Sequence, residues 1–255
     1  MLDVRVVKIG GNELDRPGWL ESCARALSLS EPLVVVHGGG RAISAMSERL
    51  GLSAEKRDGL RVTTPEIAAV VEMVLAGPVN RQVVGALRDA GIDAVGLCGA
   101  DGGLLEGHRV SEVLGHVGDI AVVRAALLES LLRAGLTPVI APLAPEAGRA
   151  DAVPLNVNAD NAAAAVAAAL QAEELLFVSD VAGVRVRGVA HPELAVSEIE
   201  GLIATGVATG GMAAKLRAAA GALAGGARAV RIGDLTLFDS SLAGTRIVAA
   251  AAQPA

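Results

Sequence analysis

Short runs of aliphatic residues alternate along this chain with longer segments in which apolar positions recur at helical spacing. The first run, VRVVKI at 4–9, is followed by a helical segment at 18–29, and the alternation continues to the C-terminus. Uninterrupted Val, Ile and Leu runs between helices are typical of strands that are buried on both faces. The pattern therefore predicts an α/β protein whose parallel sheet is covered by helices on both sides.

The expected elements follow from this alternation and from the turn residues between runs. Strands are predicted at 4–9, 32–40 (breaking into glycine), 92–99, 137–143, 175–180, 228–232 and 245–249. Helices are predicted at 18–29, 42–51, 65–89, near 121–134, 159–170, 197–205 and 211–224. Hairpins are predicted at 55–62, 100–118 and 185–188. A kink is expected at Gly77-Pro78, because proline cannot donate the helical hydrogen bond.

Composition narrows the class of protein. The 255 residues carry a formal charge of −6, with two Phe, one Trp and no Tyr. Since there is also no basic block, we expect no nucleic-acid partner. No apolar run reaches about 18 residues and the N-terminus lacks the order of a signal peptide, so we expect no membrane span and a cytoplasmic protein. Cys23 and Cys98 lie in apolar contexts and are interpreted as packing residues.

Candidate chemistry gathers at five junctions that are rich in glycine or carboxamide residues. Four follow an apparent strand and the fifth opens a helix: KIGG at 8–11, HGGG at 37–40, NVNAD at 156–160, SDVAG at 179–183 and TGG at 209–211. In doubly wound sheets, ligands bind in the crevice beyond the carboxyl ends of the strands. Unobstructed backbone amides at such turns bind anions. Neither G-x-G-x-x-G after HGGG nor Gly-Lys-Ser/Thr is present, so a dinucleotide site and a P-loop are not indicated.

Lysine is rare in this chain, and its placement is selective. Only Lys8, Lys56 and Lys215 are lysines among 22 basic residues, and both Lys8 and Lys215 lie beside a Gly-Gly pair. Alone, KIGG would fit an ordinary turn with a surface lysine. Together with Asp160, the two lysines fit phosphoryl transfer, because a compact ammonium can follow a migrating phosphoryl group and a carboxylate can orient it.

Seven motifs occur in the order and rough spacing of the amino acid kinase superfamily. They are VVKIGG, VVHGGGRAI, GLRVT, LGHVG, NVNADNAA, SDVAGV and TGGMAAKL, and they span nearly the whole chain. The chain resembles this superfamily, and most closely its members that phosphorylate the side-chain carboxylate of N-acetyl-L-glutamate in arginine synthesis. The resemblance implies an open three-layer αβα sandwich with a mainly parallel central sheet shared by two lobes. It implies an amino-acid substrate lobe at 1–172, which also forms a homodimer, and an ATP-binding lobe at 173–255.

The resemblance also assigns roles to residues. Lys8 and Lys215 would stabilise the transition state, and Asp160 would hold both lysines in place. Substrate binding falls to Gly11, Gly39, Gly40, Arg61, Asn156 and Asn158. Nucleotide binding falls to Gly10, Asp180, Val181, Ala182, Gly183, Thr209 and Gly210. Mg²⁺ would be carried by the ATP phosphates, with no metal ligand from the protein.

Two further expectations concern catalysis and assembly. No general base is required, because the acceptor carboxylate is already ionised at neutral pH. The chain starts at its first strand, without the N-terminal helix that arginine-inhibited hexameric members use. We therefore expect an arginine-insensitive homodimer.

Other functions stay open on the sequence. Arg41, Lys56 and Arg57 suit a sister kinase that acts on aminoadipate or glutamate attached to an acidic carrier protein. Kinases for glutamate, aspartate, carbamate or uridylate share the lysine and glycine motifs, but fit GLRVT and NVNAD less well. A non-catalytic amino-acid or nucleotide sensor is the alternative from another class, and it would have no need for Lys8, Asp160 and Lys215 together.

Overall fold

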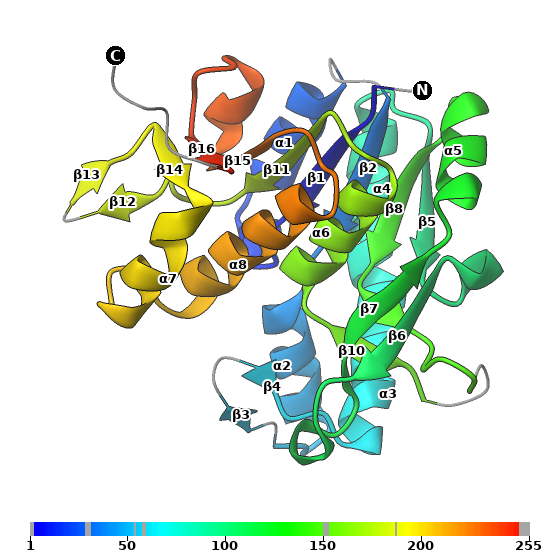
Figure 1. The fold of residues 1–255 in the computed structure, drawn as a ribbon. Coiled ribbons are helices and arrows are strands. Elements are labelled where there is room, and N and C mark those ends of the chain that lie inside the picture. The colour runs from blue at the N-terminus through cyan, green and yellow to red at the C-terminus, as the bar shows by residue number, and fades with distance from the viewer. Residues whose placement is uncertain are drawn as a thin grey trace, which may run out of the picture.

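A single eight-stranded sheet forms the centre of the molecule (Figure 1). The computed structural model describes residues 3–28, 32–53, 55–57, 60–149, 153–186 and 188–249. The strand order is β14-β16-β15-β11-β1-β2-β8-β5. The strands are β1 (Arg5–Ile9), β2 (Leu33–His37), β5 (Ala94–Cys98), β8 (Thr137–Ala141), β11 (Glu174–Val178), β14 (Glu193–Ala195), β15 (Val230–Gly233) and β16 (Thr245–Val248). The strands from β15 to β5 are mutually parallel and only β16 and β14 run the other way, so the mainly parallel sheet is confirmed.

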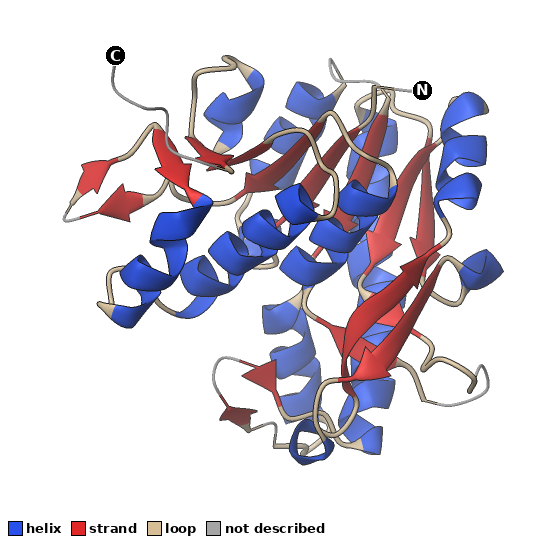
Figure 2. Cartoon of the chain, viewed as in Figure 1, coloured by secondary structure: helices blue, strands red, loops and turns tan. Residues whose placement is uncertain are grey.

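Helices cover both faces of this sheet, as the blue ribbons on either side of the red strands show (Figure 2). They are α1 (Trp19–Leu27), α2 (Gly40–Arg49), α3 (Pro65–Val74), α4 (Asn80–Asp89), α5 (Ala125–Arg133), α6 (Ala159–Ala169), α7 (Val196–Ala204) and α8 (Gly210–Ala224). Alternate residues of β1 enter different cores: Val6 packs with α5 to α8, whereas Val7 and Ile9 pack with α1, α3 and α4. This is the period of two that a strand imposes. The predicted αβα sandwich is confirmed.

A smaller sheet lies beside the central one. It has the order β6-β7-β10-β9 and comprises β6 (Leu105–Arg109), β7 (Val117–Val123), β9 (Leu143–Ala144) and β10 (Leu155–Val157). The predicted antiparallel pairing within 100–118 is present as β6 and β7. The helix expected near 121–134 begins only at Ala125, because β7 continues to Val123 opposite Leu105. The short strands β9 and β10 carry too few residues to show a period in the sequence.

Two hairpins extend from this core. The predicted hairpin at 55–62 pairs β3 (Lys56–Arg57) with β4 (Leu60–Arg61), and its expected turn lies outside the described residues. The second pairs β12 (Arg185–Val186) with β13 (Val189–Ala190). Short 3₁₀ turns complete the fold: η1 (Glu13–Asp15), η3 (Asp101–Gly103), η4 (Glu112–Leu114) and η5 (Leu235–Phe238).

The segment from Pro65 to Asp89 forms one helical rod with a defect in its middle. A π-turn, η2 (Leu75–Val79), joins α3 to α4, and Gly77 within it has non-helical angles of φ −95 and ψ −113. The kink predicted at Gly77-Pro78 is therefore confirmed. The rod is long and apolar enough to cross a membrane by composition alone. Ile67, Val71 and Val74 are buried in the core, so packing against the sheet accounts for that composition.

Two alanine-rich helices lie side by side on one face of the sheet, α6 and α8 (Figure 1). Ala163 and Ala167 of α6, and Ala219 and Ala222 of α8, are buried there. Small side chains allow a close approach: a methyl group placed on Gly225 would lie 2.6 Å from Cβ of Ala168. The close packing brings the beginnings of both helices to the carboxyl end of β1.

Candidate active site

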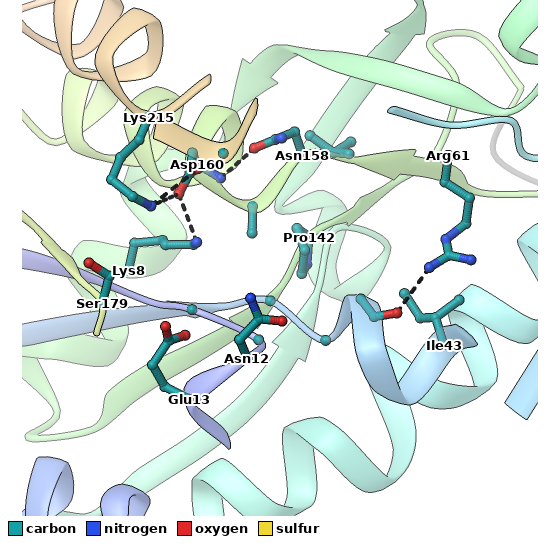
Figure 3. A pocket seen from close by; sticks show the side chains of 18 of the residues that line it. Lys8, Asn12, Glu13, Ile43, Arg61, Pro142, Asn158, Asp160, Ser179 and Lys215 are labelled. Atoms are coloured by element: carbon teal, nitrogen blue, oxygen red, sulfur yellow. Dashed lines mark hydrogen bonds and ion pairs between the residues drawn. The ribbon is translucent and has the colours of Figure 1, made fainter. Parts of the chain in front are cut away.

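A pocket of about 500 Å³ opens beyond the carboxyl ends of four neighbouring parallel strands (Figure 3). The residues that directly follow β1, β2, β8 and β11 all line it, namely Gly10, Gly38, Pro142 and Ser179. All three lysines of the chain, Lys8, Lys56 and Lys215, also line it. Parallel strands end at one edge of a sheet, and ligands bind in the crevice outside that edge.

Lys8, Asp160 and Lys215 meet at one side of this pocket (Figure 3). Lys8 Nζ lies 2.8 Å from Asp160 Oδ1. Lys215 Nζ donates to Asp160 Oδ1 at 3.2 Å and to Oδ2 at 3.4 Å. Lys8, Asp160 and Lys215 are 7%, 6% and 8% exposed. The structure thus brings together a strand end, a helix start and a second helix that lie far apart in the sequence.

The electrostatics of this triad leave one positive charge in excess. Burial alone would raise the pKa of Asp160, but the charges and hydrogen bonds of Lys8 and Lys215 hold that pKa below its ordinary value. The pKa of Lys215 is lowered to about 8, first by burial and then by the charge of Lys8, against the opposing effects of Asp160 and Glu13. The Lys215 ammonium also lies 5.3 Å from the centre of the Phe177 ring, which attracts cations. A buried pair of ammonium groups with one carboxylate between them favours an incoming anion.

Helix N-termini add to this positive potential. Gly40 is the first residue of α2, Ala159 the first of α6, and Gly211 and Met212 lie in the first turn of α8; all four line the pocket. Each helix start carries partial positive charge and free N–H groups. Three such starts and the lysine pair therefore suit a ligand with several negative charges, such as a polyphosphate.

Backbone contacts explain most of the glycines at the ends of β1 and β2. A methyl group on Gly11 would lie 2.5 Å from the backbone N of Gly39, and one on Gly38 would lie 3.0 Å from the backbone N of Gly11. The two turns therefore pack backbone against backbone. Gly40 differs, since nothing lies within 4 Å of a methyl group placed there, and this residue borders the open space of the pocket.

His37 anchors the second of these turns and faces no ligand. Its Nδ1 lies 3.0 Å from Gly38 O, and its Nε2 lies 3.1 Å from Asn80 Nδ2, so the network is satisfied when Nδ1 donates and Nε2 accepts. Asn80 Nδ2 also donates to Val139 O at 2.9 Å. Burial lowers the pKa of His37 to about 4, although the Gly38 carbonyl opposes this. The imidazole is therefore neutral and structural.

On the other side of the pocket, Arg61 and Asn156 present polar groups from the second sheet and the β3–β4 hairpin. Arg61 Nη2 donates to Gly40 O at 2.9 Å and to Ser44 Oγ at 2.8 Å (Figure 3). Asn156 Nδ2 donates to Thr63 Oγ1 at 3.2 Å. These bonds fix both side chains at the rim while leaving further guanidinium and amide hydrogens available.

Asn158 caps α6, so the NVNAD segment passes from a strand into a helix before Asp160. Its Oδ1 accepts hydrogen bonds from the backbone N of Asp160 at 2.7 Å and of Asn161 at 3.4 Å. The backbone is extended only as far as Asn158, so Asp160 reaches the pocket from a helix and not from a strand. The cap therefore sets the direction from which the Asp160 side chain enters the pocket.

Most of the residues predicted from sequence line this one pocket. They are Lys8, Gly10, Gly11, Gly39, Gly40, Arg61, Asn156, Asn158, Asp160, Asp180, Val181 and Lys215. Ala182, Gly183, Thr209 and Gly210 are not among the lining residues. Gly183 packs against β16, where a methyl group would lie 2.8 Å from Thr245 Oγ1, and Thr209 is the N-cap of α8.

The pocket also contains residues that received no individual role from the sequence, although Gly38 and Ser179 belong to two of the five predicted junctions. They include Asn12, Glu13, Gly38, Ile43, Leu75, Pro142, Ser179 and Met212. Gly38 and Ser179 could have been assigned a role, since each directly follows an apolar strand run. Glu13 and Leu75 could not, because a 3₁₀ turn and a helix kink bring them back to the pocket.

Residues 3–234 match the amino acid kinase family, and the chain belongs to this family. Two relatives are acetylglutamate kinases. That of Chloroflexus aurantiacus is 48% identical over 92% of this chain and 93% of its own length. That of Chloroflexus aggregans is 45% identical over 97% of this chain and 98% of its own length. Among solved structures, smu.665 from Streptococcus mutans has a TM-score of 0.84 and 30% identity over 98% of this chain and 100% of its own.

Proposed function

We propose that this protein transfers the γ-phosphoryl group of ATP to the side-chain carboxylate of N-acetyl-L-glutamate, a step of arginine biosynthesis. The observation that carries the proposal is the pair of buried ammonium groups, Lys8 and Lys215, on one carboxylate at the carboxyl edge of the sheet. Acetylglutamate kinase relatives that align over nearly the full chain support the choice of acceptor.

In this proposal the protein acts by positioning and charge neutralisation. Lys8 and Lys215 stabilise negative charge on the transferring phosphoryl group, and Asp160 holds both ammonium groups at the right place. Amides of Gly11, Gly39 and Gly40 donate to phosphoryl and acceptor oxygens. Arg61, Asn156 and Asn158 orient the acceptor amino acid. Arg61 binds its α-carboxylate through two parallel hydrogen bonds, as a bidentate pair. The acceptor carboxylate is already ionised, so no proton has to be removed.

The nucleotide is assigned to the other side of the pocket. Gly10, Asp180 and Val181, with Ala182, Gly183, Thr209 and Gly210 beyond them, form the proposed ATP site. Residues 1–172 then form the amino-acid lobe and 173–255 the nucleotide lobe, with their seam between β1 and β11. Mg²⁺ enters on the ATP phosphates and neutralises part of their charge; the described chain contains no group of three or more His, Cys, Asp or Glu side chains that could cage a metal.

The proposal includes a cytoplasmic homodimer formed through the amino-acid lobe and insensitive to arginine. Sedimentation of the purified chain tests the dimer. Titration with arginine during turnover tests the insensitivity.

Trapping of the acyl phosphate tests the reaction. Incubation with MgATP, free N-acetyl-L-glutamate and hydroxylamine should yield the hydroxamate. Parallel reactions with free glutamate and with aminoadipate on a carrier protein serve as controls. Product only from the carrier-bound acceptor would show the proposed substrate to be wrong, and no product from any acceptor would favour a sensor.

A further inference from the structure

We propose that Glu13 is a ligand of the Mg²⁺ that accompanies ATP, with the hydroxyl of Ser179 as a second oxygen donor beside it. The inference rests on the proposed use of ATP. It adds a protein ligand to a metal that would otherwise be held by phosphates and water alone.

Glu13 is a buried acid whose charge acts on Lys215 only at longer range, where it raises the pKa of the lysine. It is 4% exposed and lines the pocket. Within the described residues, its carboxylate makes no hydrogen bond and no ion pair, although Lys8 and Lys215 lie on the same side of the pocket (Figure 3). A carboxylate that lines a ligand pocket without a direct partner can offer its oxygens to a cation bound there, because buried charges in proteins are paired or coordinate metals.

The local backbone holds this carboxylate over the phosphoryl-binding turn. Glu13 begins the short turn η1 directly after KIGGN, and its Oε2 occupies the space that a side chain on Gly10 would need. Because Gly10 has no side chain, the Glu13 carboxylate has room to lie over the turn. The carboxylate therefore faces the edge where β1 ends.

Ser179 supplies the second observation. Its hydroxyl oxygen is buried and has no hydrogen-bond partner in the described structure, and it lines the same pocket. Ile9 and Val178 are paired residues of β1 and β11, so Gly10 and Ser179 are the next residues on adjacent parallel strands. The unpaired Ser179 hydroxyl and the carboxylate that fills the space over Gly10 therefore lie at neighbouring strand ends.

Charge and donor type point to Mg²⁺ as the missing partner. An ionised Glu13 would repel a nucleotide polyphosphate bound at the same turns unless a cation lay between them. Mg²⁺ prefers hard oxygen ligands and is typically held by one or two carboxylates together with substrate phosphates and water. A single carboxylate with a neighbouring hydroxyl fits that pattern.

Calorimetric binding of AMP-PNP to the full chain, with and without Mg²⁺, tests the proposal. The wild-type protein should bind AMP-PNP more tightly when Mg²⁺ is present. Glu13→Gln should lose about 10- to 100-fold of that metal-dependent gain. Its affinity for metal-free AMP-PNP should stay the same or improve, since a repulsive charge is removed. Ser179→Ala should lose a smaller part of the gain.

Asp15→Asn is the matched control. Asp15 lies in the same short turn, but it is exposed and pairs with Arg41 at 3.5 Å, so this variant should behave as wild type. A direct measurement on the wild-type protein guards against misfolding of a variant: in crystals with Mn²⁺ and AMP-PNP, the anomalous peak should lie about 2.1 Å from a Glu13 carboxylate oxygen.

Three outcomes would overturn the inference. The first is an unchanged metal-dependent gain in Glu13→Gln. The second is a manganese peak remote from Glu13. The third is a Glu13→Gln variant whose only change is a shifted alkaline limb of activity, which would make Glu13 a positioning residue for Lys215. Failure of the proposed use of ATP looks different, since the wild-type protein would then bind no AMP-PNP with or without metal.

Discussion

Lys8 and Lys215 reach the same carboxylate oxygen, Oδ1 of Asp160, at 2.8 and 3.2 Å. Lys8 comes from the first strand of the sheet and Lys215 from its last long helix, so the contact joins the two ends of the fold. With no anion bound, Asp160 is the shared partner of both ammonium groups. An arriving phosphoryl group would compete for the same protons, and this shared partner defines the consequences of several substitutions.

Lys215→Ala should lower kcat by about 10²- to 10³-fold and leave nucleotide binding comparatively intact. The reason is that the ammonium stabilises charge that develops in the transition state. Steady-state kinetics with calorimetric ATP binding measures both quantities. Arg217→Ala is a suitable control, because Arg217 lies on the same helix but is exposed and pairs with Glu200 at 2.8 Å. A loss confined to KM would contradict the proposed role.

Asp160→Asn should destabilise the protein as well as inactivate it. Removing the carboxylate leaves two buried ammonium groups without their counter-charge, and breaking such a buried pair costs about 3–5 kcal/mol. Urea unfolding measures the change in the free energy of unfolding. The double variant Asp160→Asn with Lys215→Met should recover part of this loss, because one of the unpaired charges is removed. Equal stability of the single and double variants would contradict the shared-partner description.

The activity should fall as pH rises through about 8. The pKa of Lys215 is lowered to about 8 by burial and by the charge of Lys8, and the protonated form is the one that stabilises the phosphoryl group. The kcat/KM profile of the wild-type protein should therefore bend downward near this pH. Because ATP adds negative charge, the bend in kcat should lie at higher pH than the bend in kcat/KM. A flat profile up to pH 9 would contradict the assignment.

The contribution of Lys215 to stability should rise with pH, whereas activity falls. Between about pH 8 and 10.5, the unfolded chain still binds the Lys215 proton that the folded chain has released. The contribution of Lys215 to the free energy of unfolding therefore increases with pH in this window. The difference in unfolding free energy between wild type and Lys215→Met, followed from pH 7 to 10, isolates this contribution from other groups. The free energy of unfolding of wild type should rise relative to that of Lys215→Met from pH 8 to 10. A difference that stays constant or falls over this range would show that the Lys215 pKa is not lowered.

Gly11→Ala and Gly40→Ala should separate packing from ligand access. A methyl group at Gly11 meets the backbone N of Gly39 at 2.5 Å, so this variant should lose stability and Tm. A methyl group at Gly40 meets nothing and lies at a helix start, so Tm should hold or rise slightly. It should nevertheless raise KM, because the methyl group enters the pocket. Full activity in Gly40→Ala would show that no ligand approaches that amide.

Much of the fold could be predicted from the sequence. Aliphatic runs such as 4–9 and 32–37 became buried parallel strands, and the helical rod at 65–89 with its defect at Gly77-Pro78 formed as expected. These features depend on local periodicity and on proline and glycine chemistry, which are readable over about ten residues. The start of the helix predicted near 121–134 was wrong. Residues Ile120 to Val123 pair with β6 as the end of β7, although their apolar side chains resemble the start of the next helix.

Part of the candidate site could also be predicted from the sequence, and part could not. Glycine junctions and scarce lysines marked where an anion would bind, because turn geometry and charge are properties of short segments. Glu13 and Phe177 gave no comparable signal. Their positions depend on the register of β1 with β11 and on how α8 packs over the sheet.

The sequence by itself determined which segments become strands and helices and which turns expose backbone amides, because both follow from local side-chain pattern. The tertiary structure alone decided that Lys8, Asp160 and Lys215 share one buried oxygen contact. It also decided that the carboxylate of Glu13 enters the same pocket without a hydrogen bond or ion pair to any described residue. Those relationships arise from strand order and from the close approach of two alanine-rich helices, and long-range packing of that kind leaves no period in the sequence.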